Sequence, residues 1–272
     1  FSRMQQNMPK NFYPDNMVKR KKNRSNGGTF LSFVVILVGF GLCVMLAMLF
    51  SNFITVGSFS FSNNNEMKKN GYTIYAVSIF QSTNFSSAGT SAASFQDKGA
   101  AGYVYFDNGI FHVLASGYKE KSDADKVVEK LISQGQSARL LTIKVSSTSL
   151  SGSFSQSEQT ALNNALMCYS NCFDSLYDMS VALDTNVSTA NEIKNQLSTL
   201  LSSTKETKTN FDKAFSSRLT EKLLEISLSL KDVEDYIDDI STSADSLSSR
   251  LKYCYFQIIE ENQSLKKVLE ES

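Results

Sequence analysis

A long stretch without any charged side chain, residues 25–65, constrains this chain more than any other feature of its sequence. Its centre, Phe30–Phe50, is almost entirely apolar. As a helix, these 21 residues would extend about 31 Å at 1.5 Å per residue, close to the ~30 Å hydrocarbon core of a bilayer. The sequence therefore predicts a transmembrane helix within residues 29–56.

Basic residues stand on one side of this apolar run only. Immediately before it come Lys19, Arg20, Lys21, Lys22 and Arg24, whereas the first cations after it are Lys68 and Lys69. The positive-inside rule then predicts a cytoplasmic tail at 1–28 and an extracytoplasmic remainder, that is, a single-pass cell-membrane protein. A cleaved signal peptide is the alternative, but its apolar core of 7–15 residues would be shorter than this run.

The net charge is zero, with 27 basic and 27 acidic residues, but the charges are unevenly distributed. Residues 1–28 carry +6, residues 29–149 carry +2 and residues 150–272 carry −8. Because the basic excess is confined to the short tail, it indicates membrane orientation and not nucleic-acid binding.

After a Ser/Asn-rich linker at 57–70, residues 71–149 show the pattern of a small α+β domain. Asp107-Asn108-Gly109 between two apolar runs is a strong hairpin signal, because Asn and Gly tolerate positive φ. The predicted order is β-α-β-β-α-β, an antiparallel sheet with both helices on one face. The elements are expected at 72–80, 86–98, 101–106, 110–116, 122–135 and 138–146.

Residues in these strands resemble the SPOR domain, a peptidoglycan-binding module of bacterial envelope proteins. The resemblance rests on Tyr75-Ala76-Val77, on Lys98-Gly99-Ala100-Ala101-Gly102-Tyr103-Val104-Tyr105, on Gly109-Ile110-Phe111-His112-Val113-Leu114-Ala115-Ser116-Gly117-Tyr118 and on Asp123-Ala124-Asp125-Lys126-Val127. It spans residues 72–145. It implies recognition of glycan strands stripped of stem peptides, which accumulate at the division or sporulation septum.

In that family the ligand contacts come from the sheet face that carries no helices. A first-strand Gln of the family corresponds to Ser78 here, and the third-strand contacts correspond to Ile110 and His112. The first strand departs from the family, since Ser78-Ile79-Phe80 replaces Gln-x-Gly. The resemblance and strand alternation together give the candidate glycan-binding residues Ser78, Phe80, Ile110, His112 and Leu140.

Strand alternation assigns the two faces of the sheet. The residues expected to face the two helices are Val77, Ile79, Phe111, Val113, Leu141 and Ile143. Those expected on the opposite face are Ala76, Ser78, Phe80, Ile110, His112, Leu140 and Thr142. The second set combines apolar side chains with a few polar groups, which suits the binding of sugar rings. It also suits a surface covered by the chain's own helices or by a partner, and a surface without a role is the third alternative.

Catalysis has little support in the sequence. With one histidine and no tryptophan, the chain has no H-E-x-x-H, no G-x-S-x-G and no phosphate-binding loop. The lone His112 is more often structural than catalytic. No enzyme activity, cofactor or metal site is predicted.

The region 153–272 contains neither glycine nor proline, so long helices are expected. A heptad seam runs from Leu219 to Val268, and a less regular seam precedes it from Leu162 to Phe215. Since the two seams are out of phase, we expect a turn in the polar segment 202–210 and a helical hairpin or three-helix bundle, with a further break near 184–186. Such a region serves either as a spacer or as a partner-binding or self-associating coiled coil.

Four cysteines, Cys43, Cys168, Cys172 and Cys254, match neither a disulfide-rich scaffold nor paired zinc knuckles. Cys168 and Cys172 share a helix face and are interpreted as ordinary core residues. A bridge from either one to Cys254 is the alternative.

The sequence thus predicts a bitopic envelope protein whose SPOR-like domain binds denuded septal peptidoglycan in cell division or sporulation. The alternative is a membrane-anchored coiled-coil scaffold that binds a protein partner and has lost glycan binding.

Overall fold

The computed structural model describes residues 66–68, 71–146, 149–151, 153–242 and 246–271. The predicted cytoplasmic tail and transmembrane helix lie outside these residues. Among the described helices, none combines the length and apolar character needed to cross a bilayer.

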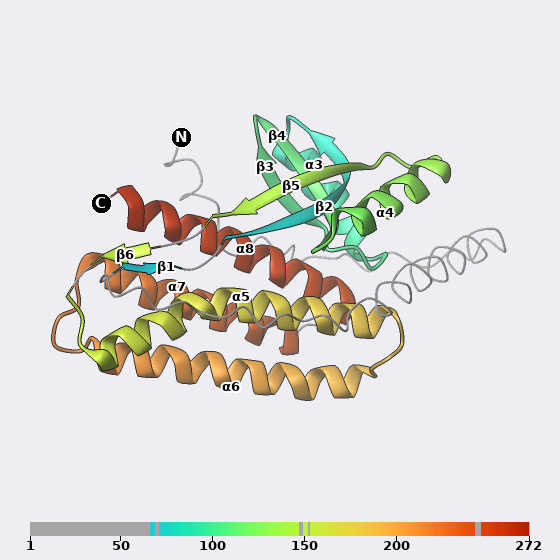
Figure 1. Ribbon diagram of the computed structural model, residues 1–272. Coiled ribbons are helices and arrows are strands. Elements are labelled where there is room, and N and C mark those ends of the chain that lie inside the picture. The colour runs from blue at the N-terminus through green and yellow to red at the C-terminus, as the bar shows by residue number, and fades with distance from the viewer. Residues whose placement is uncertain (1–65, 69–70, 147–148, 152, 243–245, 272) are drawn as a thin grey trace. The chain divides into compact units, whose positions relative to one another are not determined.

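A four-stranded antiparallel sheet forms the first half of the described chain (Figure 1). Its strands are β2 (Tyr72–Ser82), β3 (Tyr103–Asp107), β4 (Ile110–Tyr118) and β5 (Arg139–Val145), in the spatial order β3-β4-β2-β5. Helix α3 (Phe85–Gln96) follows β2, and helix α4 (Lys121–Ser133) follows β4. The predicted α+β class and the order β-α-β-β-α-β are confirmed.

Local sequence explains the ends of these elements. Asn84 caps α3 by accepting a hydrogen bond from the Ser87 backbone N–H. Asn108 and Gly109 have φ of 47° and 82°, so the predicted Asn-Gly turn joins β3 to β4. Gly135, at φ 76°, follows α4 and ends it as expected.

A short second sheet joins the two ends of this domain. Strand β1 (Glu66–Lys68) pairs antiparallel with β6 (Ser149–Ser151). The last part of the predicted linker 57–70 therefore contains a strand. This pairing brings the chain that enters the domain beside the chain that leaves it.

The C-terminal region forms four helices in the described residues: α5 (Gln156–Asp184), α6 (Ala190–Ala214), α7 (Glu221–Thr242) and α8 (Leu247–Glu271). Capping boxes, Ser155 with Glu158 and Thr189 with Glu192, start α5 and α6. Each helix packs against the next in sequence, and α8 also packs against α5. This arrangement is an up-and-down bundle of four helices, and not the predicted helical hairpin or three-helix bundle.

The break predicted near 184–186 is confirmed, since α5 ends at Asp184. The turn predicted at 202–210 is wrong because those residues lie inside α6. Their hydroxyls donate to backbone carbonyls one turn earlier, as Thr207 does to Ser203 and Thr209 does to Lys205. The polar segment is therefore helical, and most of it is exposed, although Thr204 is buried. The turn lies instead between α6 and α7.

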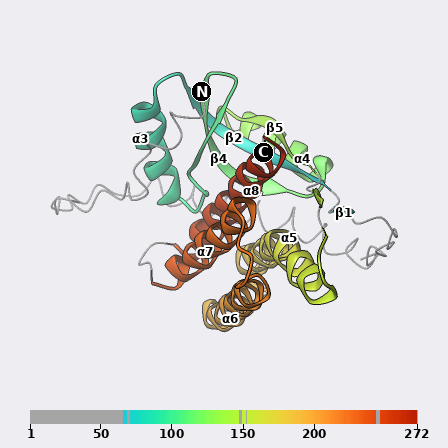
Figure 2. The ribbon, with the colours of Figure 1, turned by 90° about the vertical axis from the view of Figure 1, so that its left-hand side faces the viewer.

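The single seam from Leu219 to Val268 is also divided, between α7 and α8. Both helices turn their apolar stripes toward one core, through residues such as Ile226 and Ile237 on α7 and Leu251 and Ile258 on α8. The apolar period of the sequence therefore continues from α7 into α8 and conceals the boundary between the two helices. In Figure 2, α8 lies beneath the sheet, and α6 lies on the far side of the bundle.

Candidate functional site

Two predicted site residues, Ser78 and His112, lie buried beside each other in the sheet. Their exposed fractions are 1% and 2%, and the Ser78 Oγ lies 3.4 Å from the His112 Nδ1. The Ser78 hydroxyl also donates to the Phe80 carbonyl. Burial, with the nearby Arg139 guanidinium, lowers the pKa of His112. Neither side chain is presented to a ligand on the surface.

Phe80 and Leu140 do not lie on the predicted face. Both pack against the core formed by α3, α4 and the sheet. Irregularities in the β2–β4 pairing on either side of Ser78 move Phe80 to that side.

The predicted assignment of β5 is wrong by one residue. Leu140 pairs with Val77 and therefore shares its face, whereas Leu141 and Ile143 face the helical bundle. The third strand is as predicted, with Phe111 and Val113 on the α3/α4 side. Ile110, half-buried and paired with Asp107 in the hairpin, alternates with Phe111.

Helix α8 covers the sheet face that was expected to be free. The ring of Tyr103 stacks on Phe256 at 5.6 Å between centroids and meets Tyr253 edge-on at 5.1 Å. The Tyr103 hydroxyl donates a hydrogen bond to the Glu260 carboxylate. Burial, and then the Glu260 charge, raise the pKa of Tyr103 well above its ordinary value.

Strand β4 provides a backbone contact for the same helix. The Gly117 N–H donates to the Tyr255 hydroxyl oxygen at 2.7 Å. Gly117 also leaves room for the neighbouring Phe256 ring. Further along α8, the Gln263 amide donates to the Lys144 carbonyl on β5. Side chains of α8 therefore contact both the side chains and the backbone of the sheet.

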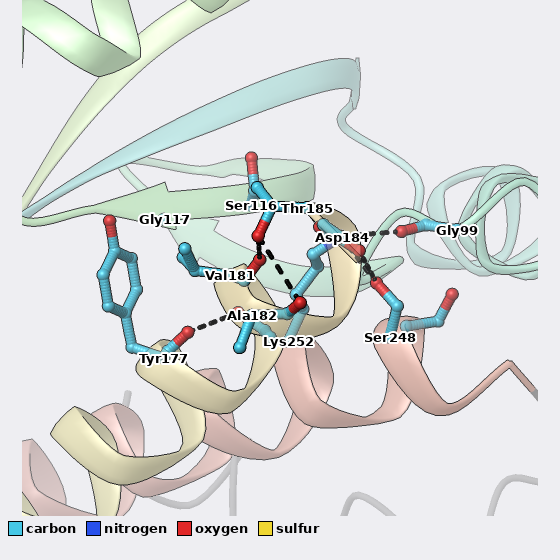
Figure 3. Close-up of polar contacts among 12 residues, drawn as sticks. Gly99, Ser116, Gly117, Tyr177, Val181, Ala182, Asp184, Thr185, Ser248 and Lys252 are labelled. Atoms are coloured by element: carbon cyan, nitrogen blue, oxygen red, sulfur yellow. Dashed lines mark hydrogen bonds and ion pairs between the residues drawn. The ribbon is translucent and has the colours of Figure 1, made fainter. Parts of the chain in front are cut away.

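Lys252 joins three segments at the buried edge of this interface (Figure 3). Its ammonium lies 2.6 Å from the Asp184 carboxylate at the end of α5 and donates to the Gly99 carbonyl at 3.1 Å. Its side chain is 8% exposed and that of Asp184 is 21% exposed. A buried ammonium with several partners fixes the geometry of the segments that surround it.

Helix α5 contacts the sheet domain as well. The rings of Tyr72 and Phe173 stack at 5.5 Å. Lys119, in the turn after β4, lies 2.7 Å from an Asp174 carboxylate oxygen and 4.9 Å from the centroid of Tyr177. Exposed pairs of this kind contribute up to about 1 kcal/mol, so the apolar contacts dominate.

Exposed apolar side chains gather in two places away from this interface. Phe85 and Phe106 are 44% and 41% exposed, and both rings contact Phe111 beside the β3–β4 hairpin. On α7, Leu224 and Leu228 are 42% and 51% exposed and lie one turn apart.

No metal-binding cluster of three or more side chains occurs among the described residues. No three His, Cys, Asp or Glu side chains converge there on a common point. Comparison of the chain with protein-family models, curated proteins and solved structures gives no match. The fold and its contacts define an α+β domain joined to a helical bundle through a buried interface.

Apolar residues outside the heptad seam of α8 are a sequence signal for that interface. Tyr255, Phe256 and Ile259 lie outside the seam of α8, yet each is 1% exposed. A helix with apolar residues on more than one side is expected to be buried on more than one side. These residues therefore mark the second contact surface of α8.

Proposed function

We propose that this chain is a non-catalytic, membrane-anchored scaffold protein in which the sheet domain serves as a docking surface for the chain's own helices. The proposal rests on one observation: α8 covers the sheet face on which a glycan strand would have to bind. A ligand on that face would have to displace Tyr253, Phe256 and Glu260 from Tyr103.

The sheet domain itself is proposed to be SPOR-like. Support comes from the β-α-β-β-α-β order and from the Gly102-Tyr103 and Leu114-Ala115-Ser116 segments of the sequence. Glycan binding by its sheet face is the less favoured alternative, since Ser78 and His112 are buried.

The membrane anchor and its orientation are supported by the sequence alone. The uncharged run 25–65 and the cations at 19–24 favour a cytoplasmic tail at 1–28 and an extracytoplasmic scaffold. Partner binding is proposed for surfaces outside the α8 interface, where Phe106 and Leu228 are exposed.

A sedimentation assay with peptidoglycan sacculi tests the choice between the two functions. The full chain in detergent is mixed with intact sacculi and with amidase-treated sacculi. The scaffold proposal predicts equally weak binding to both. Preferential binding to treated sacculi that is lost in Ile110→Ala, but kept in the control Ile132→Ala on exposed α4, would establish the glycan function instead.

Site-specific photocrosslinking tests the positive part of the proposal. A photoreactive residue replaces Leu228 or Phe106 in the native host, and exposed polar Lys205 on α6 is the matched control position. We expect discrete adducts from at least one apolar position and none from position 205. Absence of adducts from both apolar positions, with normal protein levels, would contradict the scaffold proposal.

A further inference from the structure

Two of the three cysteines in the described residues lie together on α5. The Cys168 and Cys172 sulfur atoms are 3.7 Å apart, and the Cys172 sulfur lies 3.5 Å from the Thr204 hydroxyl on α6. Cys254, on α8, is buried. The predicted alternative of a disulfide to Cys254 is not formed, because none of these three cysteines is in a disulfide. The close pair is the one within a single helix.

These two thiols line a cavity between α5 and α6. Its volume is about 170 Å³, ample for an ion with several water molecules. The lining residues are all uncharged: Asn164, Met167, Cys168, Asn171, Cys172, Leu200, Ser203, Thr204 and Thr207. A thiol pair beside amides, hydroxyls and a thioether differs from cysteines enclosed by aliphatic side chains.

The spacing of the sulfur atoms fits a tetrahedral metal ion. With metal–sulfur bonds of about 2.3 Å, two sulfur ligands of a tetrahedral ion lie about 3.8 Å apart. The observed separation is 3.7 Å. Both thiols can therefore bind one ion with little movement of α5.

Charge and ligand type define the class of ion. Two thiolates carry two negative charges, which a divalent cation neutralises within an uncharged cavity. Thiolates select soft or borderline ions such as Zn²⁺ and Cd²⁺ over Mg²⁺ and Ca²⁺. Because no third His, Cys, Asp or Glu joins the pair among the described residues, neutral donors or water would complete the coordination.

We propose that Cys168 and Cys172 form a two-thiolate binding site for a thiophilic divalent cation of the zinc group in the cavity between α5 and α6. Binding releases the proton of each thiol to solvent, and two metal–sulfur bonds form. The Cys168 thiol contact and burial raise the pKa of Cys172. Because each thiol must lose its proton to bind the ion, affinity is expected to increase with pH.

Titration with Cd²⁺ tests this site in the full chain carrying Cys43→Ser, in detergent with a phosphine reductant. The near-ultraviolet thiolate-to-cadmium absorption should saturate at one ion per chain. Removing a residue that only supports a metal ligand typically lowers metal affinity 10–100-fold. Cys168→Ser and Cys172→Ser each remove a proposed ligand, so each should lower the Cd²⁺ affinity by at least about tenfold. Cys254→Ser is the matched control and should bind as the parent does.

A saturating absorption that persists in the Cys168→Ser/Cys172→Ser double variant would overturn the proposal. A second measurement avoids substitutions altogether. Alkylation of each cysteine in the native chain is followed by mass spectrometry with and without Cd²⁺. We expect Cd²⁺ to slow modification of Cys168 and Cys172, and unchanged rates at both would also overturn the proposal.

Discussion

The Phe256 ring on α8 lies so close to Gly117 on β4 that a Cβ atom at position 117 would sit 3.3 Å from the Phe256 Cζ and 3.0 Å from the Ile74 Cγ2. Glycine at this position therefore allows the helix to approach the sheet. The contact is between segments that are far apart in the sequence, so it reports on the interface and not on local structure.

Gly117→Val is expected to lower the free energy of unfolding by about 1–3 kcal/mol, because the added methyl groups overpack the space between Ile74 and Phe256. Chemical denaturation of the full chain measures the change. Gly89→Ala is the control: no atom lies within 4 Å of its added Cβ, and it lies inside α3. Its expected effect is a stabilisation of about 0.5–1 kcal/mol. Equal effects of the two substitutions would argue against the close packing at Gly117.

Because Lys252 and Asp184 form an ion pair, we expect the single and double variants to differ strongly in stability. Asp184→Ala leaves a nearly buried ammonium without its carboxylate and should cost about 3 kcal/mol. Lys252→Met in the same chain removes that unpaired charge, so the double variant should be more stable than Asp184→Ala. A double variant that is less stable than Asp184→Ala would contradict the pairing.

His112 predicts a pH dependence of stability that can be isolated, since the chain has a single histidine. Its pKa is lowered in the folded state from the ordinary 6.5. The unfolded chain then takes up this proton first as pH falls, so the contribution is present above pH 6.5 and is lost as pH decreases toward the folded-state pKa.

Denaturation at pH 7.5 and 5.5 measures this effect, both values being chosen about one unit from the ordinary pKa of histidine. The parent chain should lose more stability between them than His112→Gln does, because carboxylate titration is common to both. An identical loss in the two chains would mean that His112 is not desolvated.

Much of the local structure follows from the sequence, as the sheet domain illustrates. Asn108-Gly109 specifies the hairpin, Gly135 ends α4, and the residue order gives β-α-β-β-α-β. These features depend on neighbouring residues, so periodicity and turn chemistry are sufficient to predict them.

The positions of the candidate site residues depended on features that strand alternation does not predict. The irregular pairing around Ser78 shifts Phe80 to the other face, and a one-residue difference in register exchanges Leu140 with Leu141. The contact between α8 and the sheet joins segments that are far apart in the sequence, as the 138-residue separation of Gly117 and Tyr255 illustrates. The apolar residues of α8 outside its heptad seam, Tyr255, Phe256 and Ile259, were the sequence signal for this contact.

A double-mutant cycle between Tyr103 on β3 and Glu260 on α8 tests whether the helix occupies the sheet face. Tyr103→Phe, Glu260→Gln and the double variant are compared with the parent by denaturation of the full chain. A hydrogen bond to a charged group predicts a coupling free energy of about 1.5–3 kcal/mol. In the control cycle, Tyr103→Phe with Glu234→Gln, where Glu234 on α7 pairs with Lys231, the effects should add to within about 0.5 kcal/mol. If the effects of Tyr103→Phe and Glu260→Gln on the free energy of unfolding add to within the same limit, the result would contradict the claim that α8 covers the sheet face.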